Sequence, residues 1–194
     1  MAKIRAFIAV ETPPDVVGRA TRLARRFAEA GADVKWVAAG NLHWTVKFLG
    51  DVYPRELVEI CQALQAAAVA VPPFRMSVAG AGAFPNVGRP RTLWLGAGDG
   101  GEGLVRLAEA VETEATRIGF RREGRRFEPH LTIGRVRSGG PEQAALGQLV
   151  AEAADFDGGV MEVDEVVLFS SELRPQGPVY EALERAELTG PPTA

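Results

Sequence analysis

The two histidines of this 194-residue chain are the residues best suited to proton transfer, and both occur in the same short pattern. His43 is followed two positions later by Thr45, and His130 is followed two positions later by Thr132. The ordinary pKa of histidine lies near neutral pH, so one imidazole can donate a proton while another accepts one. Such a pair suits general acid–base catalysis, with the two hydroxyl groups available to hold a substrate oxygen.

Both patterns lie in segments typical of β-strands, LHWTVKFLG at 42–50 and HLTIGRV at 130–136. Alternate side chains of a strand point to opposite faces, so each histidine shares a face with its threonine, about 6.5–7 Å along the strand. The opposite faces are expected to anchor the strands and to carry the apolar residues Leu42, Trp44, Val46 and Phe48 in the first strand, and Leu131 and Ile133 in the second. The polar faces are left for a cleft.

Two imidazole–hydroxyl pairs on facing strands suit the cleavage of a phosphodiester. In-line displacement at phosphorus needs a base on the attacking oxygen and an acid on the leaving oxygen, and two imidazoles supply both. The threonine hydroxyls could bind the non-bridging oxygens and hold the phosphate in line. This scheme requires no metal ion, and two histidines and one cysteine, Cys61, are too few for a His- or Cys-based metal site or an intramolecular disulfide.

A single His-x-Thr in a strand is most often an ordinary cross-strand pair. Threonine is about one residue in twenty, so its presence at both +2 positions by chance is on the order of a few in a thousand. A module that binds nucleotides or RNA without turnover is the alternative from another class. Two titratable groups facing each other argue against that alternative, because binding alone does not need them.

The elements that carry the two motifs are arranged as an internal duplication. A shift of about 87 positions brings His43 onto His130 and Pro54 onto Pro141, and aligns five predicted elements in order. The expected strands are 3–10, 42–50, 74–80, 91–96, 130–136 and 161–173, and the expected helices are 13–31, 54–70, 102–118 and 141–154. Gly80–Gly82 and Phe84–Pro85 indicate a loop at the lip of the cleft.

We therefore expect one two-lobed domain over residues 1–188, with repeats at about 3–81 and 90–170, a final strand at about 178–188 and a frayed tail at 189–194. The net charge of −3 excludes a general polyelectrolyte binder, but arginines are concentrated between Arg117 and Arg137. This basic segment indicates either a local anionic ligand or a solvated loop. No apolar run reaches the roughly 18 residues of a membrane span, and no signal-peptide pattern is present, so a cytoplasmic location is expected.

The duplicated His-x-Thr-x motifs resemble those of the two-histidine (2H) phosphoesterases, and within them the RNA 2′,3′-cyclic phosphodiesterases, also called the 2′-5′ RNA ligase family. The resemblance covers nearly the whole chain through RAFIAVE at 5–11, NLHWTVKFLGDV at 41–52, PRTLWLG at 90–96, RRFEPHLTIGRV at 125–136 and EVVLFSSELRPQGPVYEAL at 165–183. It implies an α+β fold in which antiparallel sheets surround a central cleft and helices lie outside. It also implies metal-independent hydrolysis of an RNA 2′,3′-cyclic phosphate to a 2′-phosphate.

By position, the resemblance makes His43 the proton donor to the 3′ leaving oxygen and His130 the base that activates water. Thr45 and Thr132 match the phosphate-holding hydroxyls, and Arg135 matches a basic residue that contacts the phosphate. Strict alternation would put Arg135 on the apolar face, so we expect a bulge or strand end near Gly134. The first motif has Phe48 at the corresponding place, so the two half-sites are not equivalent.

The implied partner is an RNA with a 2′,3′-cyclic phosphate end, such as a tRNA fragment, or a cyclic nucleotide. No cofactor, metal ion or membrane is expected, and the chain is expected to be a monomer. A 2′-5′ RNA ligase and a phosphodiesterase for small cyclic nucleotides are the alternative activities.

Overall fold

The computed structural model describes residues 2–175 and 177–192, so residues 1 and 176 and the end of the expected tail, 193–194, lie outside the described residues. The helices are α1 (Pro14–Ala28), α2 (Leu57–Ala68), α3 (Glu102–Arg117) and α4 (Glu142–Glu152), with short 3-10 turns η1 (Ala39–Asn41) and η2 (Pro54–Glu56). The strands are β1 (Ile4–Glu11), β2 (Val34–Trp36), β3 (His43–Val52), β4 (Phe74–Phe84), β5 (Thr92–Ala97), β6 (His130–Val136), β7 (Asp157–Val163), β8 (Glu165–Arg174) and β9 (Gly177–Glu187). Within the described ranges, no helix is long and apolar enough to cross a membrane.

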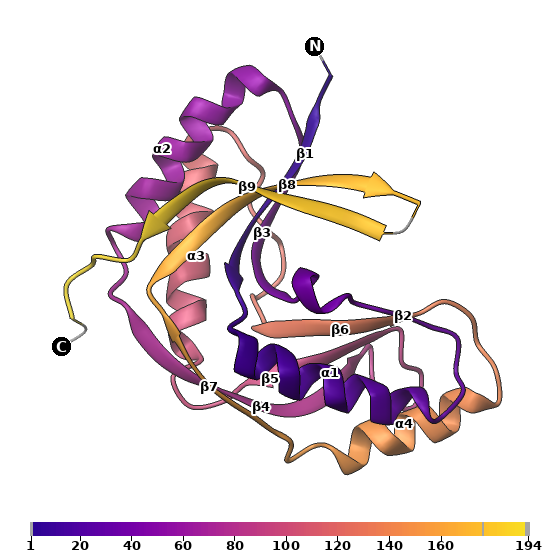
Figure 1. Cartoon of the computed structure of the whole chain (residues 1–194). Helices are drawn as coiled ribbons and strands as arrows, with labels where there is room; N and C mark the ends of the chain where they lie inside the picture. Colours follow the sequence, from indigo (N-terminus) through magenta and orange to yellow (C-terminus); the bar gives the residue numbers. More distant parts are fainter. Residues whose placement is uncertain (1, 176, 193–194) are drawn as a thin grey trace.

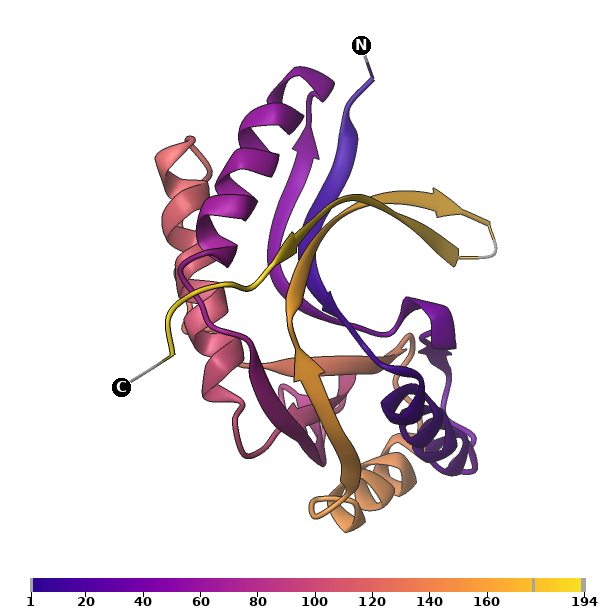
Figure 2. The ribbon, with the colours of Figure 1, turned by 60° about the vertical axis from the view of Figure 1, so that its left-hand side comes forward.

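The strands form one curled antiparallel sheet with helices on its outside (Figures 1 and 2), which confirms the expected α+β class. The order is β7-β4-β5-β6-β3-β1-β8-β9, and β2 pairs with β6. The two halves of the sheet meet between β6 and β3, where the only described bridge is Trp44 opposite Leu131. This seam lies at the motif strands, so the fold brings the two motifs together where its halves join.

The helices bury one apolar stripe each against the outer face of the sheet. In α1 the stripe is Val16, Ala20, Leu23 and Phe27, at the spacing of one helical face. Among the sheet residues under the helices, Trp44, Leu131 and Ile133 are at most 1% exposed. The alternation expected from the sequence therefore holds at these motif positions, because the apolar residues that alternate with the histidines and threonines form the core.

Each half of the sheet is covered by one helix from each sequence repeat. Helices α2 and α3 pack side by side behind β3, β8 and β9, whereas α1 and α4 pack behind β4, β6 and β7 (Figures 1 and 2). Thus the helix that follows β1 covers the half that contains β6, and the helix that follows β5 covers the half that contains β3. Each half is therefore built from both sequence repeats, because one of its two covering helices comes from the other repeat.

Several elements differ from the sequence-based expectation. The segment expected as one strand at 161–173 is two strands, β7 and β8, which break at Asp164. The expected loop at Gly80–Gly82 is part of β4, which continues to Phe84 and pairs with β5 from Val78 onward, with an irregularity between Ala79 and Ala81. The chain also stays attached beyond residue 188: the amides of Thr189 and Gly190 donate to the carbonyl oxygens of Ala68 and Val71, at the end of α2.

Candidate active site

The four motif side chains lie on one face of the sheet, across the seam between its halves. His43 begins β3 and His130 begins β6, and the bridge between Trp44 and Leu131 fixes the register. Counting one residue to either side of this antiparallel bridge places His43 opposite Thr132, and His130 opposite Thr45. In a regular pair, directly opposite side chains have Cβ atoms about 4.5–5.5 Å apart, and diagonal neighbours such as the two histidines about 7–8 Å apart. The structure thus brings together the four residues that the sequence singled out.

Each imidazole is oriented by the same backbone contact. The Nδ1 atom of His43 lies 2.8 Å from the carbonyl oxygen of Asn41, and that of His130 lies 2.7 Å from the carbonyl oxygen of Glu128. A carbonyl oxygen only accepts hydrogen bonds, so each Nδ1 must carry the proton and donate. In the neutral ring, Nε2 then has a free lone pair, and in the charged ring it has a proton to give. Both histidines therefore present Nε2 as the group that exchanges protons.

A β-bulge in each motif strand sets the direction of the side chain five residues after the histidine. In β3, Thr45 and Lys47 oppose consecutive residues of β1, so Val46 is the extra residue. In β6, Ile133 is the extra residue in the pairing with β5. The bulge expected near Gly134 is thus present, and it places Arg135 on the face of Thr132.

The equivalent bulge contradicts one expectation for the first motif. Phe48 lies on the face of His43 and Thr45, not on the apolar face with Trp44, because Val46 shifts the alternation by one residue. Its ring is 6.2 Å from that of Phe7 on β1, and the side chain is exposed. The position that holds a cation in β6 holds an aromatic ring in β3.

Arg135 is exposed and donates a hydrogen bond of 3.3 Å from Nη1 to Thr92 Oγ1. Its charge acts across the seam. Burial of the ring is the main cause that lowers the pKa of His43, the Asn41 carbonyl opposes this, and the Arg135 charge lowers the pKa further. Burial also raises the pKa of Tyr180 on β9, against the opposing charges of Arg135 and Arg5. The Arg135 charge therefore acts on both His43 and Tyr180, which lie on the other side of the seam.

Aromatic rings surround His43. The Phe7 ring lies 4.8 Å from the His43 ring, and the Tyr180 ring meets it edge-on at 5.3 Å. Asn41 supports both sides of this contact: its carbonyl orients His43, while its side-chain amide donates a 2.8 Å hydrogen bond to the carbonyl oxygen of Pro178, near Tyr180. His130 has one such neighbour, Phe84 of β4, edge-on at 5.1 Å.

Sequence reasoning did not identify Tyr180 or Asn41 as parts of the site, and it placed Phe84 only in a loop at the lip of the cleft. Tyr180 arrives on the last strand, far from either motif, and nothing in its local pattern marks it. Asn41 acts on His43 through a backbone carbonyl, and every residue has one. The only available signal was the place of Asn41 and Glu128 two residues before each histidine, which repeats with the motif.

Neither threonine hydroxyl has a hydrogen-bond partner among the described residues, so both remain available to a ligand. In the described part of the chain, no group of three or more His, Cys, Asp and Glu residues is arranged to hold a metal ion.

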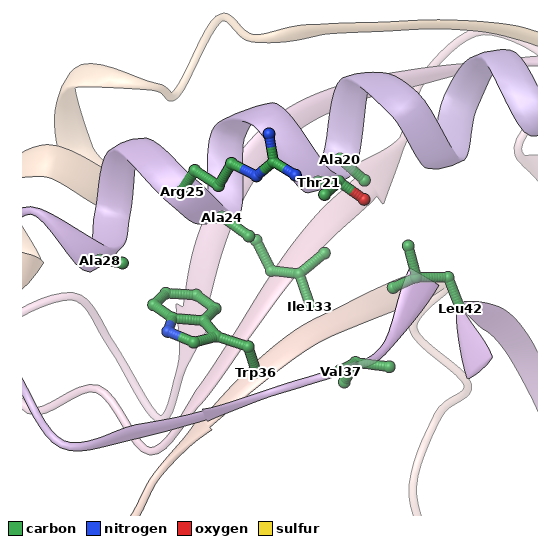
Figure 3. Close-up of a pocket in the computed structure, with 9 residues that line it drawn as sticks. All are labelled: Ala20, Thr21, Ala24, Arg25, Ala28, Trp36, Val37, Leu42 and Ile133. Carbon is green, nitrogen blue, oxygen red and sulfur yellow. The ribbon is translucent and has the colours of Figure 1, made fainter. Parts of the chain in front are cut away.

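A pocket of about 190 Å³ lies behind the site, between α1 and the β2–β6 edge (Figure 3). Its lining is largely apolar and includes Trp36, Leu42 and Ile133. Leu42 precedes His43 and Ile133 follows Thr132, so both side chains point away from the polar face. This pocket is therefore separate from the candidate active site.

Comparison with known proteins identifies the family. The model of the LigT-like phosphoesterases matches the chain twice, at residues 10–94 and 95–180. An RNA 2′,3′-cyclic phosphodiesterase of Methanothermobacter thermautotrophicus is 38% identical over 182 residues, which cover 94% of this chain and 97% of that protein. A Thermus thermophilus crystal structure superposes with a TM-score of 0.80 at 30% identity, covering 96% of this chain and 98% of that one. LigT of E. coli in its apo form superposes with a TM-score of 0.78 at 27% identity, covering 97% and 99%. The chain belongs to the family of LigT-like phosphoesterases.

Proposed function

We propose that the protein hydrolyses RNA 2′,3′-cyclic phosphate ends to 2′-phosphomonoesters. The observation that carries the proposal is the matched pair of imidazoles, each held through Nδ1 by a backbone carbonyl so that Nε2 is left for proton transfer. The names of the relatives support the substrate class, because the Methanothermobacter protein is an RNA 2′,3′-cyclic phosphodiesterase. E. coli LigT has also been crystallised with 3′-AMP, which supports a nucleotide as the ligand.

In the proposed reaction, Nε2 of His130 accepts a proton from water as the water oxygen attacks phosphorus. The bond between phosphorus and O3′ breaks, and Nε2 of His43 donates its proton to O3′. The products are a 2′-phosphate and a free 3′-hydroxyl group, with one proton gained by His130 and one lost by His43. Exchange with solvent restores both rings. Thr45, Thr132 and Arg135 bind the non-bridging oxygens, which aligns the phosphate and stabilises the charge of the transition state.

The pseudo-symmetric geometry accommodates either histidine as the acid, and the resemblance to the family assigns that role to His43. Burial lowers the pKa of His43, which disfavours its charged form in the empty site. A bound phosphodiester would oppose this effect, because its negative charge offsets that of Arg135 and favours the imidazolium.

The test is product analysis on a short RNA that ends in a 2′,3′-cyclic phosphate, in the presence of EDTA. Full turnover to a 2′-phosphate is expected. His43→Asn and His130→Asn should each lower the rate by about 10²–10⁴-fold, the usual contribution of a general acid or base. Thr45→Val and Thr132→Val keep the shape and remove one hydroxyl, and we expect smaller losses. A requirement for a divalent metal ion, a 3′-phosphate product, or wild-type rates in either histidine variant would contradict the mechanism.

Joining of RNA ends is related chemistry at the same phosphate: the 5′-hydroxyl group of a second RNA, instead of water, attacks the phosphorus of the 2′,3′-cyclic phosphate, the bond from phosphorus to O3′ breaks, O3′ takes up a proton, and a 2′-5′ linkage remains. It would appear as a joined product that resists nucleases specific for 3′-5′ bonds. The natural RNA is proposed to be a processed fragment with a cyclic end, such as a tRNA fragment, and the active form to be a monomer.

A further inference from the structure

The segment that joins α3 to β6 carries a cluster of arginines that the proposed chemistry does not use (Figure 1). We call residues 121–126, RREGRR, the basic loop. Its four arginines are exposed, and Glu123 is its one acidic residue. Among the described residues, no side-chain hydrogen bond or ion pair is made by these four guanidinium groups, in contrast to Arg117 at the end of α3, which pairs with Glu114. A protein with a net charge of −3 therefore presents uncompensated positive charge here.

The backbone of the basic loop is anchored by a buried ion pair. Lys47 Nζ lies 2.8 Å from Glu112 Oε2, and the two side chains are 2% and 14% exposed. Lys47 also donates to the carbonyl oxygen of Arg121 at 3.3 Å, and Glu112 Oε1 accepts from the amide of Glu123 at 2.9 Å. The pair thus fixes the loop at two backbone positions. A solvated loop would need no such anchor.

The basic loop leads directly into the active site. Its last arginine, Arg126, is four residues before His130, so the two Cα atoms are at most about 14 Å apart along an extended chain. The intervening Glu128 provides the carbonyl that orients His130. Phe120 and Phe127, on either side of the loop, pack against the core. Lys47 lies on β3, the strand that carries His43, and the loop leads into β6, the strand that carries His130. The ion pair of Lys47 and Glu112 therefore links the loop to both motif strands.

We propose that the basic loop binds the phosphate backbone of the RNA on the 5′ side of the cyclic end. This inference rests on the proposed function, since the terminal ribose must lie beside His43 and His130. The cyclic phosphate is the 3′ end of the strand, so the only phosphates left for the loop belong to upstream nucleotides. Guanidinium groups bind phosphate oxygens through charge-assisted hydrogen bonds. The anchored backbone lowers the entropy lost on binding, because the loop is ordered before the RNA arrives.

The experiment compares Arg125→Gln/Arg126→Gln with Arg22→Gln/Arg25→Gln, two exposed arginines of α1 on the outside of the sheet. The substrates are a 2′,3′-cyclic mononucleotide, which is too short to reach the loop, and hexameric RNA with a 2′,3′-cyclic end. Each phosphate contact on a single strand contributes about −0.7 to the slope of log affinity against log salt. For kcat/KM on the hexamer, the loop variant should lower the magnitude of this slope by about 1.4. Its turnover of the mononucleotide should change less than about twofold. The α1 variant should match wild type on both.

An equal loss on both substrates would overturn the inference, since the arginines would then act on His130 or on folding. Unchanged hexamer kinetics and salt slope would also overturn it. Fluorescence anisotropy of a labelled hexamer that ends in a 2′-phosphate separates this inference from the proposed function. If wild type hydrolyses neither substrate, the proposed function fails, while weaker hexamer binding by the loop variant alone still supports the loop as an RNA site.

Discussion

Replacing Lys47 by Met tests how much the buried ion pair beneath the basic loop stabilises the fold. The change keeps most of the side-chain volume and removes the charge, so the buried Glu112 carboxylate keeps, among the described residues, the amide of Glu123 as its one hydrogen-bond partner. Breaking a buried pair by removing one partner costs about 3–5 kcal/mol, because an uncompensated charge stays inside. A domain is stable by about 5–15 kcal/mol, so this loss is a large part of the total.

The exposed pair between Arg26 and Glu152 provides the control. Its atoms are 3.2 Å apart and its side chains are 49% and 46% exposed, so Arg26→Met should cost only about 0–1 kcal/mol. Lys47→Met/Glu112→Met removes both charges and should recover much of the single-variant loss. Urea unfolding followed by circular dichroism measures the free energies. If Lys47→Met costs no more than Arg26→Met, or if the double variant is less stable than Lys47→Met, the pair does not stabilise the fold as its burial indicates.

Two further changes test the surroundings of the site. Arg135→Gln removes a charge that lowers the pKa of His43, so this pKa should rise and the protonated fraction of His43 at a given pH should increase. A proton NMR titration of the two histidines, assigned with His130→Asn, measures the pKa. An unchanged His43 titration would refute the coupling. Gly82→Ala places a Cβ atom 2.3 Å from Cζ2 of Trp94, a β5 residue that pairs with Thr132. This clash should cost about 1–3 kcal/mol of stability and lower kcat/KM. Gly88→Ala, whose new Cβ meets nothing closer than 3.4 Å, should change neither.

The sequence was sufficient for the motif residues because their signal is local and repeated. His43 and Thr45 share a face through simple alternation, and the matching pattern at His130 predicts a second strand of the same kind. The resemblance to the family pointed to Arg135, and a bulge was then expected because strict alternation would have placed its side chain on the apolar face. The same reasoning failed for Phe48, since an aromatic residue is compatible with either face and gives no sign that Val46 is an extra residue.

The remaining parts of the site depend on contacts between distant segments. Tyr180 reaches His43 because β9 pairs with β8 and β8 with β1, and strand order is not encoded in the periodicity of any one strand. The sequence duplication likewise does not predict which half of the sheet α1 and α3 cover, because a helix covers whichever half its apolar stripe can bury. Backbone carbonyls orient both histidines, and they carry no residue-specific signal at all.

Arg135 explains how two similar half-sites could come to act differently. The repeated carbonyl contact prepares both imidazoles in the same tautomer, and the repeated bulge turns the residue at +5 toward the cleft in both strands. Only in β6 is that residue a cation, and its positive charge lowers the pKa of His43 on the other strand. In the proposed mechanism, the pKa of His43 is low in the empty site and rises when a phosphodiester offsets the charge of Arg135. The same arginine would then bind the substrate and make protonation of His43 depend in part on its arrival, alongside burial of the ring, which is the larger cause of the lowered pKa.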